Sequence, residues 1–227
     1  MPSPQRLARI AGFFYLLLAV FGGLAELVAR SNVIERGNAA ATADNIVAHA
    51  TLFRIGFVSD LIGLACFPIV AMLLYQLLRH VNQAWARAML IFVIIATAIT
   101  GANLLNHFAA LAVATDPGFA AALGADGSDA LVLLFTSLHS HGYLIAQVFF
   151  GLWLLPLGYL AYTSGLFPKA LGVTLILGCT GYLVDLLMRF LFPALGTEIS
   201  AFVLIPAVIG ELWIVGYLLT KGVRATA

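Results

Sequence analysis

The chain has 227 residues, of which 63% are hydrophobic and 9% are charged, and its formal net charge is +1. Soluble domains contain about 25% charged residues, so this composition excludes a soluble globular protein. The near-neutral balance also excludes a nucleic-acid-binding protein, which would need a strongly basic surface. A chain of this length has room for about six membrane spans of roughly 20 residues. The composition therefore predicts an integral membrane protein whose partner is the lipid bilayer.

Six apolar runs predict six transmembrane helices, at about residues 7–28, 52–78, 85–113, 131–162, 170–192 and 200–219. A short basic lead precedes the first run, and no small-residue cleavage site follows it, so we expect an uncleaved helix rather than a signal peptide. The connection over residues 31–51 is polar and alanine-rich, and its second half is compatible with a short amphipathic helix. The turns are short, which favours antiparallel neighbours. The expected fold is an all-α membrane protein, a single domain built as a compact six-helix bundle.

The distribution of charge predicts the orientation, because loops rich in Lys and Arg stay on the cytoplasmic side. With the N-terminus inside, the inner side collects seven of the eleven basic residues, and no inner loop contains an acidic residue. The loop after the third span instead carries Asp116, Asp126 and Asp129 and no basic residue. We therefore expect both termini to lie on the cytoplasmic side of a bacterial inner membrane.

Titratable side chains of four spans fall at a similar depth in the outer half of the membrane. At about 1.5 Å of rise per residue, Asp60 and His139 lie about 12 Å from the outer helix ends, and His107 and Asp185 lie about 9–10 Å from them. A charge at the bilayer centre costs about 2.5–3.5 kcal/mol, so such residues normally face one another or water. Their common depth predicts an intramembrane polar pocket that is open to the outside.

The pocket candidates are the polar residues of the outer half and the midplane: Arg54, Asp60, Asn103, Asn106, His107, His139, Gln147, Asp185, Arg189 and Glu211. Asp185 and Arg189 stand four residues apart, so a purely structural ion pair is an open alternative for them. The same alternative holds for Arg54 with Glu26 or Asp60.

Two histidines of the fourth span, His139 and His141, cannot both face the pocket, because they lie about 200° apart around a helix. His139 is favoured inside, since Tyr143 and Gln147 lie close to its face. On the third span, by contrast, Asn103, Asn106 and His107 form one polar stripe.

Imidazole and carboxylate groups together suit zinc or iron, which makes His107 and His139 candidate metal ligands. A His-x-His pair on one helix is a poor chelator, however, and ligands would have to come from three helices. A b-type haem held by the same two histidines is a further alternative. The sequence itself requires no cofactor.

Three classes of function remain open. We favour binding or transport of a small molecule, because this function requires the fewest specific arrangements of these residues. An intramembrane metal-dependent hydrolase would need a nucleophile or a metal-bound water beside a base, with Ser59 next to Asp60, or Ser137 before His141, as candidates. A non-catalytic scaffold or assembly protein is the third class.

Three segments carry a resemblance to a known family: AAATADNIVAHATLFRIGFVSDLIG (residues 39–63), GYLIAQVFFGLWLLPLGYLAYTSGLFPKALG (142–172) and GELWIVGYLLTKGV (210–223). Together with the six-span layout, they resemble a bacterial family of six-helix membrane proteins known as a domain of unknown function. The resemblance covers nearly the whole chain and implies the six-helix topology, but it implies no substrate. It also implies a set of pattern residues, namely Arg54, Ser59, Asp60, Gln147 and Glu211.

Overall fold

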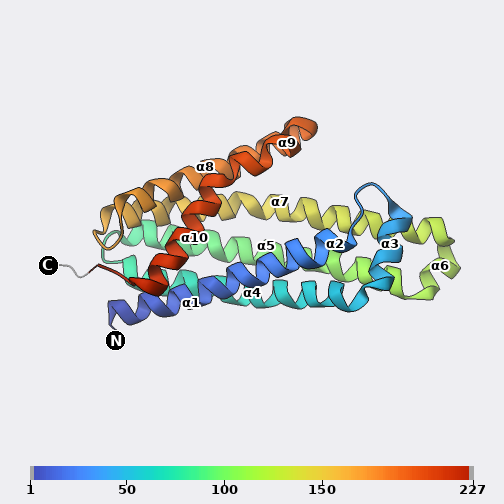
Figure 1. The fold of residues 1–227 in the computed structure, drawn as a ribbon, viewed down its shortest axis with the longest axis horizontal. Helices are drawn as coiled ribbons and strands as arrows, with labels where there is room; N and C mark the ends of the chain where they lie inside the picture. The colour runs from blue at the N-terminus through green and yellow to red at the C-terminus, as the bar shows by residue number, and fades with distance from the viewer. Residues whose placement is uncertain (1–2, 225–227) are drawn as a thin grey trace. The chain divides into compact units, whose positions relative to one another are not determined.

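The computed structural model describes residues 3–224, and in that range it is built of helices without any β-strand (Figure 1). The long helices are α1 (Pro4–Gly23), α4 (Ala50–Leu78), α5 (Gln83–Thr115), α7 (Ala125–Thr163), α8 (Lys169–Leu191) and α10 (Ile205–Thr220). The shorter elements are the π-helical segment η1 (Leu24–Arg30) and the helices α2 (Ser31–Val33), α3 (Ala39–Ala48), α6 (Pro117–Leu123) and α9 (Pro193–Val203). The predicted all-α class is confirmed.

Six helical stretches are long and apolar enough to cross a membrane: Pro4–Val33, Ala50–Leu78, Gln83–Thr115, Ala125–Thr163, Lys169–Leu191 and Pro193–Thr220. The prediction of six spans is therefore confirmed. The first stretch combines α1, η1 and α2, and it continues five residues beyond the predicted end at residue 28. The sixth stretch combines α9 and α10. The cytoplasmic placement of both termini stays a prediction.

The chain folds into two compact units, and the division between them falls within α1, α4, α5 and α7. Unit 1 contains the chain up to residue 16, residues 66–98, and the chain from residue 144 onward; unit 2 contains residues 17–65 and 99–143. The charges are divided unevenly, since unit 1 has eight of the eleven basic residues and unit 2 has seven of the ten acidic ones. The assignment of the whole chain to one domain stays a prediction.

Glycines allow close helix packing within unit 1. A Cβ atom added to Gly158 of α7 would lie 2.7 Å from the backbone oxygen of Gly172 of α8. One added to Gly178 of α8 would lie 2.8 Å from Cα of Ala207 of α10. Small residues let membrane helices approach closely. In unit 1 they hold α8 directly against α7 and α10.

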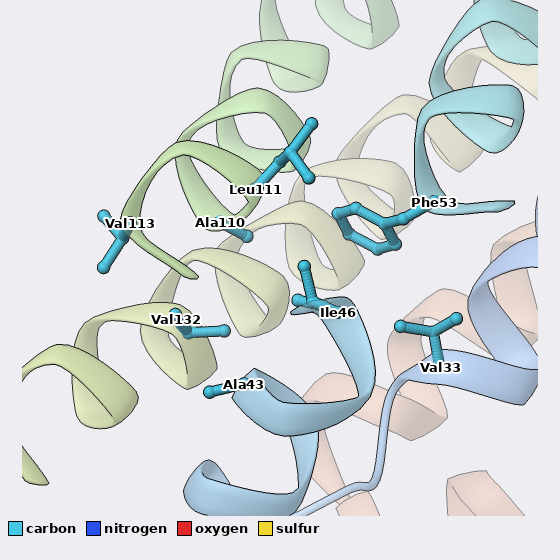
Figure 2. Packing of buried hydrophobic residues seen from close by; sticks show 8 residues of the cluster. All are labelled: Val33, Ala43, Ile46, Phe53, Ala110, Leu111, Val113 and Val132. Atoms are coloured by element: carbon cyan, nitrogen blue, oxygen red, sulfur yellow. The ribbon is translucent and has the colours of Figure 1, made fainter. Parts of the chain in front are cut away.

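Unit 2 contains a hydrophobic cluster of eight buried residues (Figure 2): Val33, Ala43, Ile46, Phe53, Ala110, Leu111, Val113 and Val132. Helix α3 contributes Ala43 and Ile46, and Figure 2 shows Ile46 among side chains of α4, α5 and α7. This helix begins where the side chain of Asn38 accepts a hydrogen bond from the backbone nitrogen of Ala41 (3.0 Å), an N-terminal cap. The predicted short helix in this connection is confirmed.

Candidate functional site

The titratable residues that share one predicted depth lie in two different clusters. Asp60 of α4, His107 of α5 and His139 of α7 come together in unit 2, and each offers one ligand atom within 4.8 Å of the others. Both histidines are buried, and the Asp60 side chain is 11% exposed. Asp185, the fourth residue, belongs to unit 1. Three of the four predicted residues thus form a group with the composition of a metal site.

His107 is held in place by Phe53. The two rings stack with their centroids 3.9 Å apart, and Nε2 of His107 donates a hydrogen bond to the backbone oxygen of Phe53 (3.0 Å). Because a carbonyl oxygen only accepts, Nε2 carries the proton and Nδ1 carries the lone pair. Nδ1 is buried and has no hydrogen-bond partner among residues 3–224. A metal-binding histidine is oriented in this way, with its other nitrogen donating to a backbone carbonyl.

His139 is positioned by Asn103. The side-chain Nδ2 of Asn103 donates to the backbone oxygen of His139 (2.8 Å), and the backbone oxygen of Asn103 lies 3.4 Å from Nδ1 of His139. Nδ2 of Asn103 also lies 3.4 Å from Nδ1 of His139, so Nδ1 faces Asn103 and Nε2 is the ring nitrogen left for another ligand. Asn106 donates in turn to Oδ1 of Asn103 (3.0 Å). The predicted polar stripe on α5 therefore orients a histidine of α7.

Arg30 supplies the positive charge next to this group. It is buried at the end of η1, where its Nε donates to Oε2 of Glu26 (2.8 Å) and its Nη1 donates to Oδ2 of Asp60. The side chain of Glu26 is 60% exposed, whereas that of Asp60 is nearly covered. Arg30 thus bridges one exposed and one nearly covered carboxylate.

Arg30 is not among the predicted pocket residues, whereas Arg54 is. Arg54 is exposed, and in the described part of the chain no acidic residue pairs with it. Glu26 and Arg30 are four residues apart near the predicted end of the first span. This spacing was the available sequence signal for an ion pair of Arg30. The alternative pairing of Arg54 with Glu26 or Asp60 is wrong, because Arg30 holds both acids.

Asp185 is completely buried in unit 1, and Gln147 of α7 is its partner. Nε2 of Gln147 donates to Oδ2 of Asp185 (2.7 Å) and to the backbone oxygen of Tyr182 (3.1 Å). The other carboxyl oxygen, Oδ1, has no hydrogen-bond partner among the described residues. Arg189 does not pair with Asp185, because the ion pairs found between residues 3 and 224 are those of Arg30. The structural ion pair left open by the sequence is therefore not formed.

Glu211 of α10 lies in unit 1 as well and binds two tyrosines. Oε2 accepts a hydrogen bond from the hydroxyl of Tyr15 (2.9 Å), and Oε1 accepts one from the hydroxyl of Tyr182 (2.8 Å). Glu211 is one of the predicted pocket residues, but neither tyrosine is. Its two hydrogen-bond partners are tyrosine hydroxyls and not histidines, so this carboxylate does not resemble the metal-type group of unit 2.

Asp185→Asn is expected to leave the fold intact. No cation among residues 3–224 pairs with this carboxylate, and one oxygen of an asparagine suffices to accept from Gln147, so the free energy of unfolding should change by less than about 1 kcal/mol. Asp185→Ala, which leaves Gln147 without its acceptor, should cost about 1–3 kcal/mol. Thermal unfolding in detergent measures both variants. Equal losses would show that the charge of Asp185 stabilises the protein.

Comparison with known proteins gives a family and no activity. A family model described as "Domain of unknown function (DUF4386)" matches residues 10–222. An "Uncharacterized protein" of Archaeoglobus fulgidus is 37% identical over 71 residues, which make up 31% of this chain and 43% of that protein. The chain therefore spans less than half the length of this curated relative. No solved structure matches the chain.

Proposed function

The chain belongs to the DUF4386 family and is an integral membrane protein, and from this premise we propose that it binds a divalent transition-metal ion through Asp60, His107 and His139. One observation supports the proposal most. Nδ1 of His107 is buried and has no hydrogen-bond partner among the described residues. The ligand of the predicted polar pocket is then a metal ion. Access from the outer face of a bacterial inner membrane is part of the same proposal.

Two imidazoles and one carboxylate are the ligand set of open zinc and non-haem iron sites. Around zinc, neighbouring ligand atoms lie about 3.3–3.5 Å apart, as follows from a Zn–N distance of about 2.0–2.1 Å. The present spread of up to 4.8 Å would have to shorten by about 1–1.5 Å as the ion binds. Three protein ligands leave further positions for water or a substrate group, which is also what a metal-dependent hydrolase requires.

Metal binding at Asp60 requires an exchange of partners. In the structure Arg30 neutralises Asp60, so an arriving cation must take over that carboxylate. Arg30 keeps a partner during this exchange, because Glu26 accepts from its Nε at 2.8 Å. The buried guanidinium therefore does not lose every counter-charge when the metal binds. The metal ion can therefore replace Arg30 as the partner of Asp60 without leaving the charge of Arg30 uncompensated.

Metal loading of the purified protein tests the proposal. The wild-type protein in detergent, stripped with a chelator, is titrated separately with Zn²⁺, Co²⁺ and Fe²⁺ under reducing conditions. We expect about one equivalent to bind, with an absorption spectrum of histidine-coordinated Co²⁺, and a rise in unfolding temperature. If folded protein binds no ion and its unfolding temperature does not move, the polar group is structural and the scaffold function is favoured.

A glycine next to the site gives a second expectation. A Cβ atom at Gly142 would collide with the side chain of Asn103, which positions His139. Gly142→Ala should therefore weaken metal binding about 10–100-fold, the usual cost of losing an orienting contact. Gly22→Ala is the matched control, because a Cβ atom there has nothing within 4 Å. A similar loss in both variants, measured by metal titration, would contradict the role of Asn103.

A further inference from the structure

A groove of about 420 Å³ runs along the first turns of α1 in unit 1, lined by Ser3, Gln5, Arg6, Arg9, Ile10 and Phe13. We propose that this groove binds an anionic phospholipid. Its phosphate lies against Arg6 and Arg9, and an acyl chain covers Ile10 and Phe13. The size lies within the range of roughly 300–1,000 Å³ that is usual for small-molecule sites.

The charge of the groove favours an anion. Arg6 and Arg9 stand three residues apart, so they share one face of α1, and both are exposed. Within residues 3–224, neither forms an ion pair with an acidic residue. Unit 1 has three acidic residues: Asp185 and Glu211 are engaged by Gln147 and by tyrosine hydroxyls, and Glu198 forms no ion pair within residues 3–224. Two guanidinium groups with fork-shaped donors therefore remain for a phosphate.

The other half of the groove favours a lipid over a free anion. Phe13 follows Arg9 by one helical turn and is 51% exposed, and Ile10 is half-buried beside it. A free phosphate would neutralise the arginines and leave this apolar surface uncovered. An amphiphile with a negative head matches both ends, and anionic lipids are recognised by basic clusters at the ends of transmembrane helices.

Contacts with the C-terminal segment hold the groove in shape. Nε2 of Gln5 donates to the backbone oxygen of Lys221 (2.6 Å), and its Oε1 accepts from the backbone nitrogen of Val223 (3.0 Å). The backbone nitrogen of Arg224 donates to the oxygen of Leu166 (3.0 Å). The first turn of α1 is thus fixed to a segment that carries two more basic residues, Lys221 and Arg224. The groove residue Gln5 is therefore held in place by contacts within the protein.

Lipid binding to the delipidated full-length protein tests this inference by native mass spectrometry with phosphatidylglycerol and phosphatidylcholine. The double variant R6Q/R9Q should bind phosphatidylglycerol about 30-fold more weakly, as expected for two lost basic contacts. The control R79Q/R87Q changes the charge of unit 1 by the same amount at another position and should bind like wild type. Phe13→Ser should also weaken lipid binding while leaving the arginines in place.

Several results would overturn the proposal. One is equal weakening in R6Q/R9Q and in the control, which would mean that only net charge matters. Another is equal binding of phosphatidylcholine and phosphatidylglycerol by the wild type. Displacement of the lipid by inorganic phosphate, together with no effect of Phe13→Ser, would show a simple anion site. Metal titration of the same variants should be unchanged, so this test is independent of the metal site.

Discussion

Replacing His139 with alanine is expected to abolish stoichiometric metal binding, whereas replacing His141 with alanine should leave the affinity within about twofold. His139 is buried and contributes one of three ligand atoms, so its loss leaves two ligands. The affinity should fall at least as far as for an orienting residue, that is by more than about 100-fold. His141 is exposed on the same helix, where its Nδ1 lies 2.8 Å from the backbone oxygen of Ser137. Zinc or cobalt titration, with elemental analysis of the purified proteins, measures both.

The fold of the His139→Ala variant should survive, because Asn103 bonds to the backbone oxygen at position 139 and not only to the ring. His107→Ala serves as an independent second variant, since its ligand atom comes from a different helix. Loss of metal in His141→Ala, or its retention in both of the other variants, would exclude the proposed ligand set.

Replacing Arg30 with methionine should destabilise the metal-free protein by about 3–5 kcal/mol, the usual cost of removing one partner from a buried ion pair. Asp60 would then keep a covered charge without its counter-ion, since its side chain is 11% exposed. A divalent ion that binds Asp60 should restore most of this stability. We therefore expect a larger metal-induced rise in unfolding temperature for Arg30→Met than for wild type, measured by thermal unfolding with and without zinc.

Arg54→Met is the matched control for that experiment, because it removes the same charge from an exposed position of the same unit. It should change the free energy of unfolding by no more than about 0.5 kcal/mol. Glu26→Gln should cost no more than about 1 kcal/mol, since the Glu26 side chain is 60% exposed. If zinc stabilises Arg30→Met no more than Arg54→Met, the metal and Arg30 do not compete for Asp60.

Much of the architecture was predictable because hydrophobicity and helical geometry decide it. Long apolar runs between short turns are sufficient to predict six spans, and the six stretches confirm them. The rotation of about 200° between positions 139 and 141 was sufficient to favour one histidine over its neighbour. The structure buries His139 and exposes His141.

Depth was a weaker guide, because it fixes one coordinate and leaves the direction around each helix open. Asp185 has the same predicted depth as His107, yet it belongs to the other compact unit and binds Gln147. The tyrosines of the Glu211 cluster were missed for a related reason. Tyr15 and Tyr182 resemble ordinary aromatic residues of membrane helices until the folded chain brings their hydroxyls to one carboxylate.

The π-helical segment η1 has a consequence for how the length of the first span can vary. A π-helical turn accommodates an extra residue within a helix and often occurs at functional sites. Removing the extra residue at a position of η1 other than Glu26 would let the segment become α-helical, and Arg30 would keep its direction toward Asp60. Deleting one residue from the regular helix α1 would instead turn Arg30 by about 100° relative to the start of that helix. Deletions within η1 should therefore be less damaging than deletions within α1.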